Sequence, residues 1–222
     1  MDRVSRLSAR TLAVLVAVGC FVAVLVLRLW LKWVGPLPGD RWAEHHLEGV
    51  ALEQPWTDLG AFFSVIGGPA VASLTALVAL WFAWRAGGWL AAAFVALACA
   101  GVVANVLLKV LSGPTPLMIL KYGDPQPGLN YPSGHTVYAV VMFGSLAWLA
   151  WARGRRDLAV VLVVLIAAMG PARVLTDAHF VSDVVAGYLV GFGWLLCAAL
   201  VTGAGGVSPR IAIHQRIVRS SA

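Results

Sequence analysis

Long apolar stretches separated by short polar ones dominate this chain. Six of the stretches are long enough to cross a bilayer as helices, which takes about 20 residues. They are residues 11–33, 60–84, 88–111, 135–152, 158–175 and 180–202. The pattern predicts an all-α membrane protein, a six-helix transmembrane bundle that forms a single domain over residues 1–222.

The charged residues are few and unevenly placed, which sets the expected orientation. Hydrophobic residues make up 60% of the chain and charged residues 12%, a balance too apolar for a soluble domain. With a cytoplasmic N-terminus, the inner side receives most of the basic residues: Arg3, Arg6, Arg10, Arg85, Arg153, Arg155, Arg156, Arg210, Arg216 and Arg219. Most acidic residues then fall outside, as the positive-inside rule expects. We predict that both termini are cytoplasmic, that 203–222 form a basic cytoplasmic tail, and that the net charge of +6 reflects topology rather than nucleic-acid binding.

Several smaller features refine this layout. The first apolar stretch runs through Arg28 and Lys32 without a small-residue cleavage pattern, so we expect a retained span rather than a signal peptide. The outer loop 34–59 is expected to contain a short helix on the membrane surface. In the second span, Gly67-Gly68-Pro69 should bend or break the helix. The last span carries glycines that permit close helix contact, namely Gly187, Gly191 and Gly193.

Ionisable and polar side chains gather at one end of the predicted spans. Such residues are costly at membrane depth and therefore indicate function. The set comprises Lys109, Ser133, His135, Arg173, His179 and Asp183. Because hydropathy and charge alone assigned the spans, the convergence of these residues on the outer face is predicted independently of their chemistry.

The spacing within this set suggests a phosphate site. Ser133 and Gly134 open a predicted helix, where unpaired backbone N–H groups and the helix dipole favour an anion. His179 and Asp183 are four residues apart, so on one helix the carboxylate can hold one ring nitrogen and leave the other as a nucleophile. Arg173 can offer several donors to phosphate oxygens, and Lys109 adds a second positive charge.

These residues resemble two signatures of the phosphatidic acid phosphatase type 2 family. Pro132-Ser133-Gly134-His135 matches the second signature, and the spacing of Arg173, His179 and Asp183 matches the third. The resemblance covers roughly residues 105–187, and the six-span layout extends it to most of the chain. It implies a metal-free and cofactor-free mechanism in which His179 attacks phosphorus, His135 protonates the leaving oxygen, and water releases phosphate.

The first signature of that family is incomplete here. The family has a lysine followed after six residues by an Arg-Pro pair, whereas Lys109 is followed by Val110 to Leu117 without an arginine. Losing one phosphate-binding cation would weaken transition-state stabilisation by about 3 kcal/mol. Lys121 either replaces that phosphate contact or is an ordinary loop lysine, and its position does not distinguish the two.

The outer loop also contains a group that could be imagined as a metal site, Glu44, His45, His46 and Glu48. Adjacent histidines on a helix point apart, so we interpret the group as a polar surface and expect no metal. The three cysteines, Cys20, Cys99 and Cys197, fall within predicted spans and form no zinc spacing.

The sequence therefore predicts a hydrolase for a phosphomonoester or diphosphate of a membrane lipid in a bacterial plasma membrane, with its active site facing outward. Polyprenyl diphosphate (undecaprenyl diphosphate, for example), phosphatidic acid and phosphatidylglycerol phosphate are all candidate substrates. Two alternatives remain open. The protein transfers the phosphoryl group to another lipid, or it is a weakly active accessory protein that binds lipid phosphates. Soluble vanadate haloperoxidases share the signatures, but this chain is too short and too apolar to be one.

Overall fold

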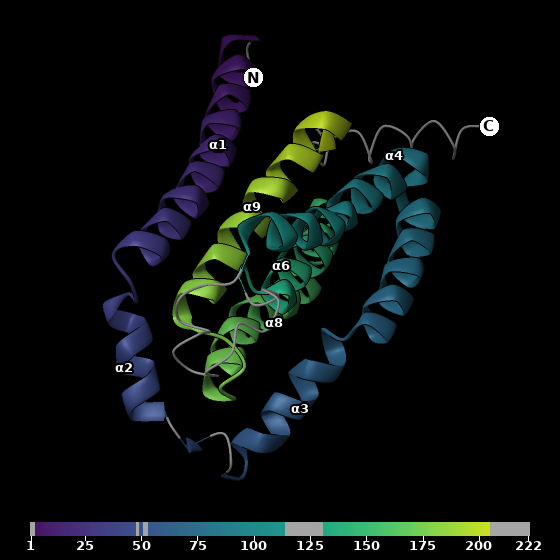
Figure 1. The fold of residues 1–222 in the computed structure, drawn as a ribbon. Helices are drawn as coiled ribbons and strands as arrows, with labels where there is room; N and C mark the ends of the chain where they lie inside the picture. Colours follow the sequence, from purple (N-terminus) through teal and green to yellow (C-terminus); the bar gives the residue numbers. More distant parts are fainter. Residues whose placement is uncertain (1–2, 48, 51–52, 114–130, 205–222) are drawn as a thin grey trace, which may run out of the picture.

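The computed structural model describes residues 3–47, 49–50, 53–113 and 131–204. Within these ranges the regular secondary structure is helical, and no strand occurs (Figure 1). The elements in chain order are α1 (Arg3–Trp33), α2 (Pro38–Leu47), α3 (Trp56–Ile66), α4 (Pro69–Ser112), α6 (Gly134–Tyr138), the π-helix η2 (Ala139–Phe143), α7 (Gly144–Ala152), α8 (Arg156–Leu175) and α9 (Val181–Thr202). The chain is thus an all-α bundle.

Five stretches of helix are long and apolar enough to cross a membrane. They are Ala9–Trp33, Pro69–Ser112, Gly134–Ala152, Arg156–Leu175 and Val181–Thr202. Four of them reproduce the predicted first, fourth, fifth and sixth spans within a few residues. The 44-residue α4 combines the predicted third span with most of the second, so the described helices do not show six separate spans.

Glycine and proline explain how the predicted second span is divided. α3 ends at Ile66 and α4 begins at Pro69, so the helix breaks at Gly67 and Gly68, as the sequence predicts. α4 is itself interrupted at Gly88, whose φ of 69° and ψ of −163° lie outside the helical region. Figure 1 shows the two parts of α4 running in different directions on either side of this interruption.

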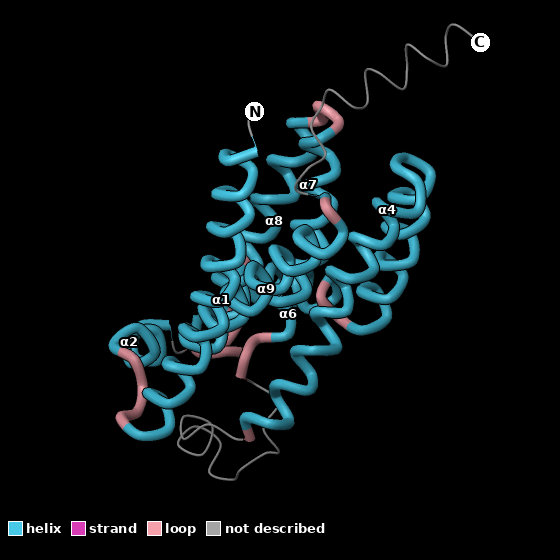
Figure 2. Tube along the Cα trace, turned by 90° about the horizontal axis from the view of Figure 1, so that it is seen from above, coloured by secondary structure: helices cyan, strands magenta, loops and turns pink. Residues whose placement is uncertain are grey.

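α9 forms the centre of the bundle. It packs against α1, α4, α6, α8 and the π-helix, and Figures 1 and 2 show it beside α1. Small residues make this close packing possible, as expected for helices in a membrane. A Cβ atom added to Gly187 would lie 2.8 Å from the carbonyl oxygen of Ser133, and one added to Gly191 would lie 2.6 Å from Cβ of Val140. Gly193 faces α1, where the ring of Phe21 lies 3.2 Å from the corresponding position.

The polar stretch 34–59 contains the predicted short helix, α2, which is amphipathic. Asp40 and Ala43 are buried, whereas Trp42 is 58% exposed. α2 contacts α9 rather than standing apart from the bundle. The predicted tail extends beyond Ala204 into residues outside the described ranges.

Replacing Gly191 by alanine tests the close packing of α9. The added methyl group would overpack the contact with Val140, and we expect a loss of about 1–3 kcal/mol in stability. Gly19→Ala is the matched control, because its Cβ atom would meet nothing within 4 Å and the variant gains only helix propensity. The free energy of unfolding in detergent micelles is measured for both variants. Equal values would contradict the close packing of α9.

Candidate active site

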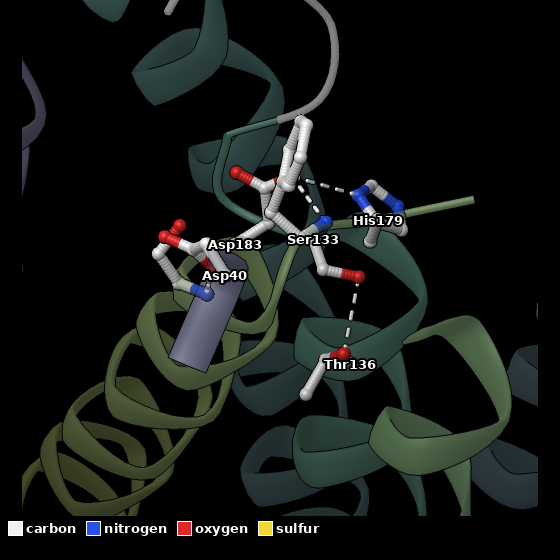
Figure 3. A network of polar contacts seen from close by, with 7 residues as sticks. Asp40, Ser133, Thr136, His179 and Asp183 are labelled. Carbon is white, nitrogen blue, oxygen red and sulfur yellow. Dashed lines mark hydrogen bonds and ion pairs between the residues drawn. The ribbon is translucent and has the colours of Figure 1, made fainter. Parts of the chain in front are cut away.

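His179 and Asp183 meet at the start of α9. Nδ1 of His179 lies 3.4 Å from Oδ2 of Asp183, and the side chains are 7% and 0% exposed (Figure 3). The prediction that both residues lie on one helix is incorrect, since α9 begins at Val181 after the N-cap Phe180. His179 lies in the preceding turn. The pair meets because the Asp183 carboxylate reaches back over the helix start, where it also accepts the backbone N–H of Phe180 at 3.2 Å.

The backbone of Asp183 fastens a second candidate segment. Its carbonyl accepts the N–H of Ser133 at 2.9 Å, which places the start of α6 against the start of α9. The Ser133 hydroxyl is fully buried and accepts a hydrogen bond from the hydroxyl of Thr136 at 3.1 Å (Figure 3). Ser133 is the N-cap residue and Gly134 the first residue of α6, as expected from the sequence. The N-terminal backbone of α6 is thereby fixed beside the His179–Asp183 pair.

Lys109 lies beside Gly134. A Cβ atom at Gly134 would be 3.7 Å from Cε and 3.8 Å from Nζ of Lys109. The same position would be 3.7 Å from Nδ2 of Asn105, which is one helical turn before Lys109 and only 1% exposed. The Oδ1 atom of Asn105 has no hydrogen-bond partner within the described ranges. Asn105, which was not among the predicted site residues, gives this part of the site a buried polar group beside the lysine.

Arg173 and His135 are held by the end of α3, which was not predicted to contribute to the site. An N–H group of Arg173 donates a short hydrogen bond to the Ser64 hydroxyl. The imidazole of His135 has a hydrogen bond with the backbone of Ser64. Gly67 packs against the His135 ring so closely that an added Cβ atom would lie 2.1 Å from Cδ2. The glycine pair is visible in the sequence as a helix break, but its contact with His135 becomes apparent only in the fold.

Charge also connects the candidate residues. His135 interacts electrostatically with Arg173, His179 and Lys109, and His179 interacts with Asp183, Lys109 and Arg173. Side chains from α4, α6, α8, α9 and the turn before α9 therefore share one location. The structure brings together the predicted set of Lys109, Ser133, Gly134, His135, Arg173, His179 and Asp183.

The protonation state of His179 is set by its surroundings. Burial lowers the pKa of the imidazole below its ordinary value, Asp183 raises it, and Lys109 and Arg173 lower it further. The lowering effects prevail, so the ring is neutral at physiological pH. With Nδ1 facing the carboxylate, Nε2 carries the free lone pair of a neutral ring.

Three other polar residues do not join this group within the described ranges. Lys121 lies outside the described residues. Tyr131 is 2% exposed, and its hydroxyl donates a hydrogen bond to the Val24 carbonyl at 2.8 Å, so it joins this part of the chain to α1. Arg28 of α1 donates a hydrogen bond to the Ser112 carbonyl and lies over the Tyr131 ring at 6.0 Å, and thus contacts the chain on both sides of residues 113–130.

The site also contains buried polar atoms with no hydrogen-bond partner within the described ranges. They include Nε2 of His135, Nε of Arg173 and Oδ1 of Asp183. Buried polar groups are normally paired, and exceptions often belong to functional sites. Within the described residues, no group of three or more His, Cys, Asp or Glu side chains is arranged to hold a metal ion.

This chain resembles known proteins in its fold and in part of its sequence. The fold resembles a crystal structure described as the first transmembrane PAP2 type phosphatidylglycerolphosphate phosphatase from Bacillus subtilis, with a TM-score of 0.62 and 18% sequence identity over 82% of this chain and 93% of that one. Comparison with curated proteins gave no match. The PAP2 superfamily model matches residues 89–204, a range that contains every candidate residue described above except those of α3. The chain is therefore a multi-pass membrane protein of the PAP2 superfamily of phosphatases.

Proposed function

We propose that this protein hydrolyses the phosphate ester or diphosphate of a membrane lipid through a phosphohistidine at His179. The observation that carries the proposal is the grouping of a buried imidazole, His179, and a partly buried one, His135, with two cations. His179 and His135 interact with each other and with both Lys109 and Arg173. A neutral nucleophile, a proton donor and two positive charges are the groups that phosphoryl transfer needs.

The first step forms the phosphoenzyme. Nε2 of His179 attacks phosphorus as the bond between phosphorus and the leaving oxygen breaks. His135 in its imidazolium form gives its Nε2 proton to that oxygen and becomes neutral, and this role fits an Nε2 that has no hydrogen-bond partner among the described residues. Lys109, Arg173 and the backbone at Ser133 and Gly134 stabilise the negative charge that develops on the phosphoryl oxygens.

The second step releases phosphate. His135, now unprotonated, takes a proton from a water molecule as the water oxygen attacks the phosphohistidine. The bond between phosphorus and nitrogen breaks, its electrons return to Nε2 of His179, and inorganic phosphate leaves. Asp183 stabilises the imidazole through Nδ1 in both steps, as an orienting carboxylate does for other catalytic histidines.

The substrate class rests on the membrane fold and on the structural relative. The site lies where long apolar helices end, so a phosphate head group can bind while its tail remains among the spans. The named activity of the Bacillus subtilis relative makes phosphatidylglycerol phosphate one member of the panel to test, beside phosphatidic acid and undecaprenyl diphosphate. We place the site on the outer face of a bacterial plasma membrane, with both termini cytoplasmic, because of the charge asymmetry.

The absent Arg-Pro pair favours a second candidate function. Because Lys109 is not followed by the arginine of the first signature, the site has one phosphate-binding cation fewer than the family pattern. A protein that lacks one phosphate-binding cation can bind lipid phosphates and hydrolyse them only slowly. Transfer of the phosphoryl group to a second lipid instead of water uses the same histidine and is distinguished by its product.

The nucleophile assignment predicts the behaviour of His179→Gln. We expect phosphate release from the lipid panel to fall by at least about 1,000-fold, because no covalent intermediate can form. His45→Gln, which changes an exposed histidine of α2, should retain activity. Purified protein in detergent with a chelator gives the rates. A phosphorylated lipid product would indicate transfer, and tight lipid binding without phosphate release in the wild type would indicate the accessory role.

The lowered pKa of His179 predicts the acidic limb of the pH profile. The nucleophile must be unprotonated, so kcat should fall only below the ordinary histidine range, at a pH under about 6.5. Asp183 raises the pKa of His179, so Asp183→Asn should move the acidic limb to still lower pH while reducing kcat. Initial rates between about pH 4 and about pH 9 bracket the ordinary histidine range and measure both effects. A limb that moved to higher pH in Asp183→Asn would contradict the assigned pairing.

The contact between Gly67 and His135 predicts a loss of activity in Gly67→Ala. The added methyl group needs the space of the imidazole, so the proton donor is displaced, and we expect kcat to fall by about 10- to 100-fold. Gly19→Ala on α1 is the control with open space around it. Turnover of the two purified variants is the measurement, and wild-type turnover in Gly67→Ala would show that His135 does not depend on this packing.

A further inference from the structure

A carboxylate from the first outer loop is buried against the start of α9. Asp40 belongs to α2 and is only 1% exposed. One of its oxygens accepts the backbone N–H of Leu37 at 3.0 Å, and the other accepts the backbone N–H of Ser182 at 2.8 Å. The second bond joins residues that are 142 positions apart in the chain. Figure 3 shows Asp40 close to Asp183 at the start of α9. In the sequence alone, Asp40 is no more than one acidic residue of the outer loop.

Helix α9 needs this bond because its own N-cap side chain cannot accept one. The N-cap Phe180 has a hydrocarbon side chain, and the Asp183 carboxylate is directed to Phe180 N–H and to His179. The N–H groups in the first turn of a helix have no partner within the helix. Asp40 therefore supplies, from a distant part of the chain, the side-chain acceptor that usually comes from the N-cap residue.

α2 also lies directly beside the nucleophile. A recess is lined by Asp40, Ala43 and Leu47 on the α2 side and by Val174, His179 and Phe180 on the other. The charge of Asp40 interacts with that of Asp183. α2 therefore contacts α9 and lies beside the turn that carries His179.

We propose that Asp40 is a positioning residue that fixes the first turn of α9 and thereby holds the Asp183 carboxylate against Nδ1 of His179. The inference rests on the proposed function, since it assigns to α2 a part in orienting the nucleophile of that reaction. Without the Asp40 carboxylate, the Ser182 N–H is left buried and unpaired in the turn that carries Asp183. The turn then loosens, and the pairing of Asp183 with His179 is lost before the rest of the helix is disturbed.

A double-mutant cycle tests this dependence. We expect Asp40→Ala to lower kcat by about 10- to 100-fold while KM stays within about twofold, because binding is retained and orientation is lost. Asp40→Asn, which keeps an oxygen for Ser182 N–H, should recover much of the activity. Asp40→Ala combined with Asp183→Asn should be no slower than Asp183→Asn alone, because both changes remove one pairing. Arg41→Gln, an exposed charge removal on the same helix, should match the wild type.

The proposal would be overturned if the two substitutions lowered kcat multiplicatively in the double variant. It would also be overturned if Asp40→Ala raised KM and left kcat unchanged. If Asp40→Ala does not fold, the same cycle is measured with Asp40→Leu, which also removes the acceptor for Ser182 N–H but fills the space of the side chain. A fall in kcat that merely tracks the unfolded fraction of the sample would also overturn it.

A second measurement separates this inference from the proposed function, because it needs no substrate. Diethyl pyrocarbonate modifies unprotonated imidazoles, and mass spectrometry of the peptide containing His179 gives the rate at each pH. The charged or titratable groups facing His179 are Asp183, Lys109, Arg173 and His135, and Asp40, Glu44 and Asp177 line the recess beside it. Asp40→Asn removes the same charge as Asp40→Ala but keeps an oxygen for Ser182 N–H, so its midpoint is the reference for Asp40→Ala. Since Asp183 raises the pKa of His179, its displacement in Asp40→Ala should move the midpoint of modification to lower pH. An unchanged midpoint would overturn the positioning role even if the wild type hydrolyses lipids, and a shifted midpoint would support it even if no tested lipid is hydrolysed.

Discussion

The buried carboxylate of Asp183 is the interaction on which the site depends. One carboxylate oxygen of Asp183 pairs with Nδ1 of His179 and accepts the N–H of Phe180. The backbone carbonyl of Asp183 accepts the N–H of Ser133. A charged group that is 0% exposed is tolerated only where such partners and the positive end of a helix compensate for lost hydration. Together, these bonds of Asp183 join the turn before α9, the start of α9 and the start of α6. The geometry of the nucleophile and the packing of α6 on α9 are therefore one arrangement.

The positive charges complete the electrostatics of that arrangement. Lys109 and Arg173 approach from α4 and α8, and Asp183 is the carboxylate that interacts with both His179 and Lys109. Burial makes the two cations costly, and a bound anion would offset part of that cost. Ser64 holds one of these cations through its hydroxyl. A region that looks like a simple helix break in the sequence thus helps to hold both the arginine and the proton donor.

Periodic hydropathy and short motif spacing were enough to predict the apolar helices, the break at Gly67–Gly68 and the convergence of the histidines and cations. Contacts between distant segments were not predictable in this way. They include the binding of Ser64 to Arg173, the fit of Gly67 on His135, and the cap that Asp40 provides to α9. Hydropathy also separated 60–84 from 88–111, whereas α4 joins most of both across Gly88, because an interruption at a glycine and a short loop have the same apolar pattern.

The distance along the chain between α2 and α9 has a consequence for biosynthesis. Membrane helices are inserted in order as the ribosome delivers them, from the N-terminus onward. Asp40 leaves the ribosome long before Ser182, and His179 emerges only with the last span. A nascent chain that lacks α9 therefore has neither the Asp183 carboxylate that pairs with His179 nor the Ser182 N–H that Asp40 accepts. Completion of the His179–Asp183 pair and docking of α2 on α9 therefore both wait for the last helix to be made.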